Sequence, residues 1–171
     1  MRLLFVALFS FFLSVPAGFQ SDFPVRFQIK NAGITVEGHF SESSFDVQFN
    51  PKDLSNSYLR GKVLPSSINT GISLRDKHLQ GRQYFQSATY PEVQMHSKRI
   101  RSLGKNQYEG VFEIQIKDFR QDKTISFSAI PKGKGYEFEA KFSINRLDFG
   151  IGEKSLVLGD EVVVEIKLRK E

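Results

Sequence analysis

The residues best suited to chemistry lie in one irregular segment, residues 68–97, which reads INTGISLRDKHLQGRQYFQSATYPEVQMHS. It carries a charged cluster at 75–78 and several aromatic side chains. Cationic donors at the mouth of a cavity can hold an anionic or carbonyl head group. The alternative is local packing, with an Arg75–Asp76 ion pair and Leu79, Phe85 and Tyr90 plugging one end of the fold. For the first interpretation, the head-group or mouth residues are Arg75, Asp76, His78, Tyr84 and Phe85.

Catalytic and metal-binding motifs are missing from the sequence. There is no cysteine, and the three histidines, His39, His78 and His96, have no partner at a metal-ligand spacing. There is no HExxH pair and no Gly-x-Ser-x-Gly elbow. His78 as a base with Asp76 as its orienter is the best enzymatic alternative, but two residues apart on a helix they face different ways. We therefore predict no catalytic residue, no metal and no cofactor.

Most of the remaining chain alternates apolar and polar residues, which is typical of half-buried β-strands. About eight such runs are separated by short turns, so neighbouring strands should be antiparallel. Gly38 and Gly61 fall on apolar faces, where strong curvature favours glycine, and this indicates a closed barrel rather than a sandwich. Within the irregular segment, Ser73 is a candidate cap for a short helical insert around residues 73–86. The 118–123 stretch is interpreted as a hairpin loop.

The apolar strand faces should line the interior of this barrel. The strands are mostly shorter than the roughly ten residues of a membrane barrel, and the C-terminus is charged, so the apolar face is expected to point inward. Phenylalanine dominates these faces, with seventeen in the chain. The predicted lumen residues are Phe27, Val36, Phe40, Phe45, Phe49, Met95, Phe112, Ile114, Phe127, Phe138 and Phe142.

The N-terminus and the overall charge set the expected location and exclude some partners. Residues 1–17 combine Arg2, an apolar run and small residues before a cut after Ala17, which predicts a signal peptide followed by one domain over 18–171. Export to the periplasm or secretion follows. The net charge of +5 is mild, and no ribonucleoprotein motif is present, so we predict no nucleic-acid binding. We also expect no stable membrane insertion, and the sequence leaves a homodimer open.

An ordered set of motifs resembles the YceI-like family. The set comprises Ser67-Ile68-Asn69-Thr70, Arg75-Asp76-Lys77-His78-Leu79, Tyr84-Phe85, Tyr90-Pro91-Glu92-Val93, Val36-Glu37-Gly38-His39-Phe40 and Asn145-Arg146-Leu147-Asp148-Phe149-Gly150-Ile151. The resemblance implies an exported, lipocalin-like, eight-stranded antiparallel barrel that holds a long isoprenoid or other lipid chain. The chain departs from the family at Asp118–Lys123, where a Gly-x-Thr-Lys type of turn is usual, so head-group contacts near this loop are open.

These observations together predict a non-enzymatic, exported protein that binds a long apolar ligand in its lumen for storage or transport. The candidate ligands are a polyisoprenoid, an isoprenoid quinone or a fatty-acid derivative, held by burial of about 0.8 kcal/mol per methylene. Two alternatives remain at this stage. One is an enzyme that acts on a lipid or quinone-like substrate at the barrel mouth, and the other is a structural or partner-binding barrel with a filled core.

Overall fold

The computed structural model describes residues 23–171, so the predicted signal peptide and its cleavage site lie outside the described residues. The described chain forms ten strands, one α-helix and three short 3₁₀ helices. In chain order they are β1 (Val25–Asn31), β2 (Ile34–Phe40), β3 (Ser43–Gln48), η1 (Leu54–Asn56), β4 (Tyr58–Val63), η2 (Pro65–Ser67), β5 (Ile68–Asn69), α1 (Ser73–Gln80), β6 (Val93–Gly104), β7 (Gln107–Ile116), β8 (Phe119–Lys132), β9 (Gly135–Asn145), η3 (Arg146–Phe149) and β10 (Leu158–Lys170).

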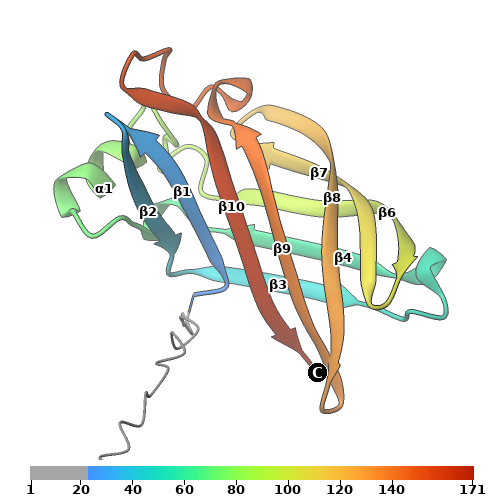
Figure 1. The fold of residues 1–171 in the computed structure, drawn as a ribbon. Coiled ribbons are helices and arrows are strands. Elements are labelled where there is room, and N and C mark those ends of the chain that lie inside the picture. Colours follow the sequence, from blue (N-terminus) through green and yellow to red (C-terminus); the bar gives the residue numbers. More distant parts are fainter. Residues whose placement is uncertain (1–22) are drawn as a thin grey trace, which may run out of the picture.

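All ten strands belong to one curled antiparallel sheet with the order β3-β4-β6-β7-β8-β9-β10-β1-β2-β5. Figure 1 shows β1, β2 and β8–β10 crossing in front of β3, β4, β6 and β7, with the insert that carries α1 at one end. The all-β, antiparallel prediction is confirmed. The predicted closed, eight-stranded barrel is not confirmed. The sheet has ten strands, and β3 and β5 are its two edge strands.

The structure has ten strands rather than about eight because two bent strands are each broken by a short irregular segment. Residues 41 and 42 separate β2 from β3, and η2 separates β4 from the two-residue β5. Backbone hydrogen bonds cross this break, from Ser41 N to Ser67 O at 3.1 Å and from Leu64 N to Glu42 O at 3.1 Å. β2 and β3 run in clearly different directions on either side of it (Figure 1). The break is therefore a bend, and β5 was hidden from the periodicity because two residues show no alternation.

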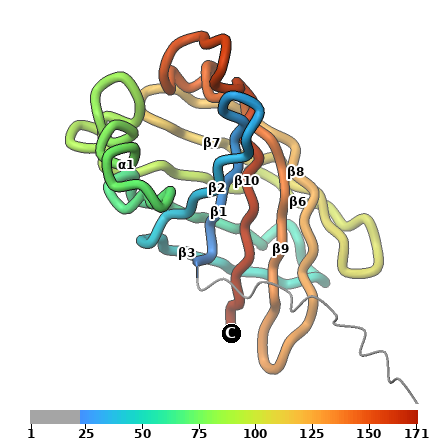
Figure 2. Tube along the Cα trace, turned by 60° about the vertical axis from the view of Figure 1, so that its left-hand side comes forward, coloured from blue at the N-terminus to red at the C-terminus, as the bar shows by residue number. Residues whose placement is uncertain are grey.

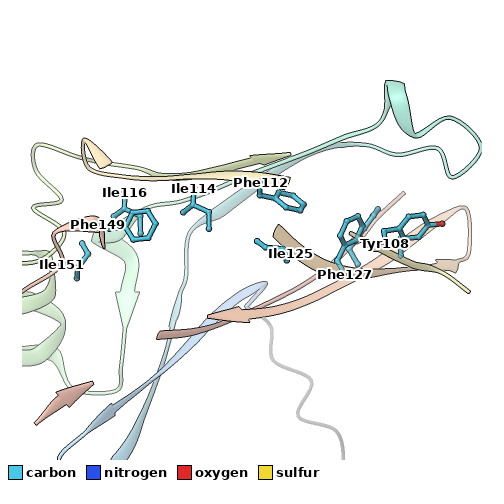
Figure 3. Close-up of a cluster of buried hydrophobic side chains, with 10 residues drawn as sticks. Tyr108, Phe112, Ile114, Ile116, Ile125, Phe127, Phe149 and Ile151 are labelled. Atoms are coloured by element: carbon cyan, nitrogen blue, oxygen red, sulfur yellow. The ribbon is translucent and has the colours of Figure 1, made fainter. Parts of the chain in front are cut away.

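Strict alternation along β7 builds the main core. Phe112, Ile114 and Ile116 are buried, while the residues between them are more exposed. Figure 3 shows these side chains in a row along one face of β7, facing Ile125 and Phe127. Tyr108, Phe127 and Phe138 extend this core cluster across the paired strands β7, β8 and β9.

A second, smaller cluster of buried side chains lies toward the insert. It consists of Val25, Phe40, Val63 and Ile68, with Phe27, Phe45, Leu79 and Phe85 packed against it. The apolar inner face of the sheet is thus filled from both sides, by two separate groups.

Two glycines leave room for an aromatic ring from the neighbouring strand. Gly38 is paired with Phe27, and a Cβ on Gly38 would come within 2.3 Å of the Phe27 ring. Gly61 is paired with Phe45 in the same way, and a Cβ on Gly61 would lie 3.0 Å from the Phe45 ring. The sequence placed both glycines on curved apolar faces, and the structure adds that each is covered by a ring from the adjacent strand.

The insert and one hairpin differ in detail from the prediction. The helix covers only Ser73–Gln80, its N-cap is Ile72, and Ser73 is its first residue rather than its cap. The loop predicted at 118–123 shrinks to a two-residue turn, because residues 119–124 pair with 111–116 in β7. Lys117 takes a φ of 55° in this turn, a conformation that lets the two long strands connect directly.

Substituting Gly38 with alanine should destabilise the fold by about 1–3 kcal/mol, because the new methyl group displaces the Phe27 ring from its place on the strand. Urea unfolding measures the loss. The control is the double variant Gly38→Ala/Phe27→Leu, in which the smaller side chain should recover part of what the alanine costs. A double variant whose loss equals the sum of the two single losses would contradict this contact.

Candidate functional site

Between the two clusters, the sheet encloses a cavity of about 200 Å³. Its walls come from β1–β4, β6, β7, β9 and β10, together with the insert and the η3 loop, and they are almost wholly apolar. A cavity of roughly 150 Å³ lined by aliphatic and aromatic groups stays dry and accepts one benzene ring. The space therefore suits part of an apolar chain or a small ring.

Seven of the predicted lumen residues line this cavity. They are Phe27, Val36, Phe40, Phe45, Met95, Ile114 and Phe142. They come from β1, β2, β3, β6, β7 and β9, so the topology gathers them from across the chain.

The other four predicted lumen residues, Phe49, Phe112, Phe127 and Phe138, are not among the cavity-lining residues. The last three are only 3–4 % exposed in the main core. The Phe49 ring packs edge-on against Phe138 at 5.3 Å between centroids, and edge-on against Tyr108 at 5.1 Å. These rings fill one end of the interior. The alternation places a side chain on the inner face but does not say where along that face space remains.

Several lining residues escaped the sequence prediction, chiefly Val162, Val164 and Ile166 on β10. They show the same alternation as the predicted set, but the prediction favoured phenylalanine. Val164 pairs with Phe27 on one side and with Phe142 on the other, so three cavity-lining residues stand side by side.

The main polar group at the cavity is a small network at the start of the insert. Arg75 donates from Nε to Thr70 Oγ1 at 2.7 Å and from Nη2 to the Thr70 carbonyl at 2.8 Å. Asp76 Oδ1 accepts from the Thr70 backbone N–H at 2.9 Å and from its hydroxyl. Thr70 and Arg75 line the cavity, whereas Asp76 holds Thr70 in place from behind. Thr70 was not among the predicted mouth residues, although the sequence places it five residues before Arg75.

The remaining mouth residues separate into two groups. Tyr84 and Phe85 line the cavity, and the Phe85 ring meets Phe40 edge-on at 6.1 Å. His78 is exposed on α1 and is not a lining residue. Within residues 23–171, no group of three or more His, Cys, Asp and Glu side chains could hold a metal ion.

A buried arginine fixes the loop that closes the other side of the cavity. Arg146 is 3 % exposed and lines the cavity. Its guanidinium donates to the carbonyls of Ile151, Glu153 and Gly159, each at 2.8 Å, and pairs with Asp160 at 3.2 Å. Five donors in a fixed planar fork suit such a set of oxygens, and a lysine could not reach them all.

Hydrogen bonds tie the insert, the β7–β8 turn and the η3 loop together around the cavity. The Tyr90 hydroxyl donates to Asp118, and the Lys117 ammonium donates to the Gly150 carbonyl. Gly152 N–H donates to the Gln83 carbonyl at 2.8 Å. The bond to Asp118 raises the pKa of the Tyr90 phenol, and burial lowers the pKa of the Lys117 ammonium. This side of the rim is therefore rigidly linked.

A curled antiparallel sheet around an apolar cavity defines a lipocalin-like class of fold, and comparison with known proteins identifies the family. The YceI-like domain matches residues 20–169, and the chain belongs to the YceI-like family.

Its relatives include a UPF0312 protein of Staphylococcus aureus (strain N315), 27 % identical over 135 residues, which are 74 % of this chain and 76 % of that one. A UPF0312 protein of Yersinia pestis (strain Pestoides F) is 24 % identical over 134 residues, covering 74 % and 69 %.

Solved structures show the same fold. BcnA of Burkholderia cenocepacia superposes with a TM-score of 0.82 at 22 % identity, covering 86 % of this chain and 95 % of its own. A polyisoprenoid-binding domain from Saccharophagus degradans superposes with a TM-score of 0.66 at 12 % identity, covering 85 % and 91 %. At these identities the likeness concerns the fold alone. In residues 23–171, no helix is long and apolar enough to cross a membrane.

Replacing Arg146 with methionine should lower the free energy of unfolding by about 2–4 kcal/mol, since it leaves buried carbonyls and Asp160 without their donor. Arg101→Met is the matched control. The Arg101 side chain is 69 % exposed in its pair with Glu109, so this substitution should lower the free energy of unfolding by less than about 0.5 kcal/mol. Chemical denaturation at neutral pH measures both. Equal losses in the two variants would show that the Arg146 network contributes no more than a surface pair.

Proposed function

We propose that this protein binds the apolar chain of a lipid-like ligand in the cavity and carries or stores it outside the cytoplasm. The single observation behind this is the cavity itself, with almost entirely apolar walls and polar networks only at its edges. Burial of each methylene contributes about 0.8 kcal/mol, so even a short enclosed segment provides useful affinity. The candidate ligands remain a polyisoprenoid, an isoprenoid quinone or a fatty-acid derivative.

The size of the cavity limits how a long chain would be held. At about 200 Å³ it accommodates a short segment, so the rest of a long chain must extend through the mouth or displace flexible side chains. Met95 is unbranched and flexible, and it lines the space. The proposal therefore includes a ligand that is enclosed at one end and exposed at the other.

Arg75 is the proposed contact for a polar head group. Two of its five N–H donors are engaged by Thr70, and the guanidinium lies at the cavity edge. An oxygen of a carbonyl, hydroxyl or phosphate group at that edge would gain a charge-assisted hydrogen bond. Asp76 acts as the support of Thr70, and Tyr84 and Phe85 provide apolar walls beside it. His78 is exposed, so a head-group role for it has no geometric support.

A binding role fits the site better than catalysis. An enzymatic mechanism at the mouth would need a base held by an orienting group and aimed into the cavity. His78 is not among the cavity-lining residues, and the carboxylate of Asp76 is engaged by Thr70. The related structure from Saccharophagus degradans is described as a polyisoprenoid-binding domain, which favours the same class of ligand.

The proposal also includes a wall that is continuous at the bend between β2–β3 and β4–β5. Ser67 is buried at this bend. Its hydroxyl oxygen accepts a hydrogen bond from the Glu42 N–H at 3.0 Å, and its carbonyl oxygen accepts one from the Ser41 N–H. With this join, the ten strands would act as eight bent ones around the ligand. Export to the periplasm is part of the proposal and rests on the signal-like residues 1–17.

The direct test is native mass spectrometry and solvent extraction of the protein purified from its exporting cell, followed by titration with a polyprenyl alcohol. We expect a co-purified apolar compound and saturable binding. The absence of both would refute the proposal, whereas turnover of the added compound would favour the enzymatic alternative.

Filling the cavity from β10 should abolish binding while leaving the fold intact. Val164→Phe puts a ring into the space between Phe27 and Phe142, and we expect at least about tenfold weaker binding. The matched control is Val163→Phe, the same change one residue away on the opposite face, which should leave affinity within about twofold. Fluorescence titration with a polyprenyl probe measures both. Equal affinities would place the ligand elsewhere.

A further inference from the structure

The most exposed apolar side chains gather at the cavity mouth. Among residues 23–171, eight large hydrophobic side chains are strongly exposed, and five of them lie on two segments beside cavity-lining residues. A sixth, Phe119, pairs with the cavity-lining Ile116 across the β7–β8 turn. Of the five, three lie on one lip, Ile34 at 70 %, Leu156 at 106 % and Val157 at 58 %. The other two, Ile72 at 53 % and Leu74 at 70 %, lie at the start of α1, beside the cavity-lining Thr70 and Arg75.

The first lip is one continuous piece of structure. The Ala32 N–H donates to the Val157 carbonyl at 2.8 Å, which joins the β1–β2 turn to the loop before β10. Asn31 pairs with Ile34 on one side and with Leu158 on the other. Asn31 and Leu158 line the cavity, so the exposed tips continue directly into its wall. Figures 1 and 2 show this turn, the loop and the insert at the same end of the molecule.

Exposure of this kind needs an explanation. A soluble domain normally leaves single apolar side chains scattered over its surface, whereas clusters around an opening mark an interaction site. Leu156 projects fully into solvent although the core cluster lies only a few residues away, at Ile151. Nothing among the described residues covers these tips.

We propose that the two lips dock on a lipid bilayer, with Ile34, Leu156 and Val157 entering the acyl region around the cavity mouth. The proposal rests on the proposed function for the nature of the cargo. An apolar ligand crosses water at a cost of about 0.8 kcal/mol for each exposed methylene. Docking the mouth on the bilayer lets the chain pass from acyl phase to cavity without that exposure.

The geometry favours a bilayer over a protein partner. The apolar tips stand on two separate segments, each beside cavity-lining residues, so a protein partner would have to contact both segments at once. A fluid acyl layer accepts separate tips at no such cost, in the manner of peripheral membrane anchors.

Charge at the first lip nearly cancels, so the attraction should be mainly apolar. Lys154 and the buried Arg146 both pair with Asp160, and the same end of the molecule carries one further cation, Lys30, and one further anion, Glu153. Docking should therefore depend little on anionic lipid or on salt, unlike binding by a basic patch. This distinguishes the proposed surface from a general attraction of a positively charged protein to membranes.

The test measures co-sedimentation with vesicles of phosphatidylcholine, alone or mixed with phosphatidylglycerol, at 0.1 M and 1 M salt, where the Debye length is about 10 Å and 3 Å. The rim variant is Ile34→Thr/Leu156→Ser/Val157→Thr. The matched control is Leu103→Ser/Ile130→Ser, which removes exposed apolar side chains near the β6–β7 and β8–β9 turns, away from the mouth. All proteins are purified identically from the exporting cell, so any contribution of the N-terminal segment cancels.

We expect the rim variant to lose about tenfold or more in vesicle partitioning, and the control to change less than about twofold, in both lipids and at both salt concentrations. Equal partitioning of rim variant and wild type overturns the proposal. So does binding confined to anionic vesicles at low salt, or concentration-dependent self-association that the rim variant abolishes. Polyprenyl titration without vesicles separates the two proposals: saturable binding with no vesicle association refutes docking alone, and the reverse refutes the cargo.

Discussion

The fold depends on how the curled sheet covers its apolar inner face. Alternation along every long strand turns one row of large side chains inward, and these must be covered because burial is the main stabilising force and no disulfide assists it. Packing of Phe49, Tyr108, Phe127 and Phe138 fills one end, while the other end closes over Phe40, Val63 and Ile68. Phe85 and Val93 pack against both clusters, and the space left between the clusters is the cavity. Function would then follow from incomplete packing rather than from a constellation of reactive groups.

Local polar networks hold the cavity open at its edges. Arg146 gathers the carbonyls of the η3 loop, and Thr70 joins Arg75 to Asp76. Both networks lie where the regular ladder stops, since that is where backbone groups need partners other than a neighbouring strand. The same residues that satisfy these groups also border the cavity. Structural and binding roles are therefore shared at its rim.

Two features of this protein connect its interior to its surroundings. The cavity is short relative to a polyisoprenoid, and its mouth carries exposed apolar side chains. A chain that is only partly enclosed and a rim that is only partly polar suit a carrier that loads from a membrane.

The sequence by itself determined most of the strands, the inward direction of their apolar residues and the family, because period-two alternation and ordered motifs are local properties of the chain. It also located the insert that carries Arg75, Tyr84 and Phe85. Only the tertiary structure decided which inner residues meet one another. Phe112 and Phe142 have the same local signature, yet the first lies in the filled core and the second faces the cavity. That difference depends on strand register and sheet curvature, which arise from pairings between residues far apart in the chain.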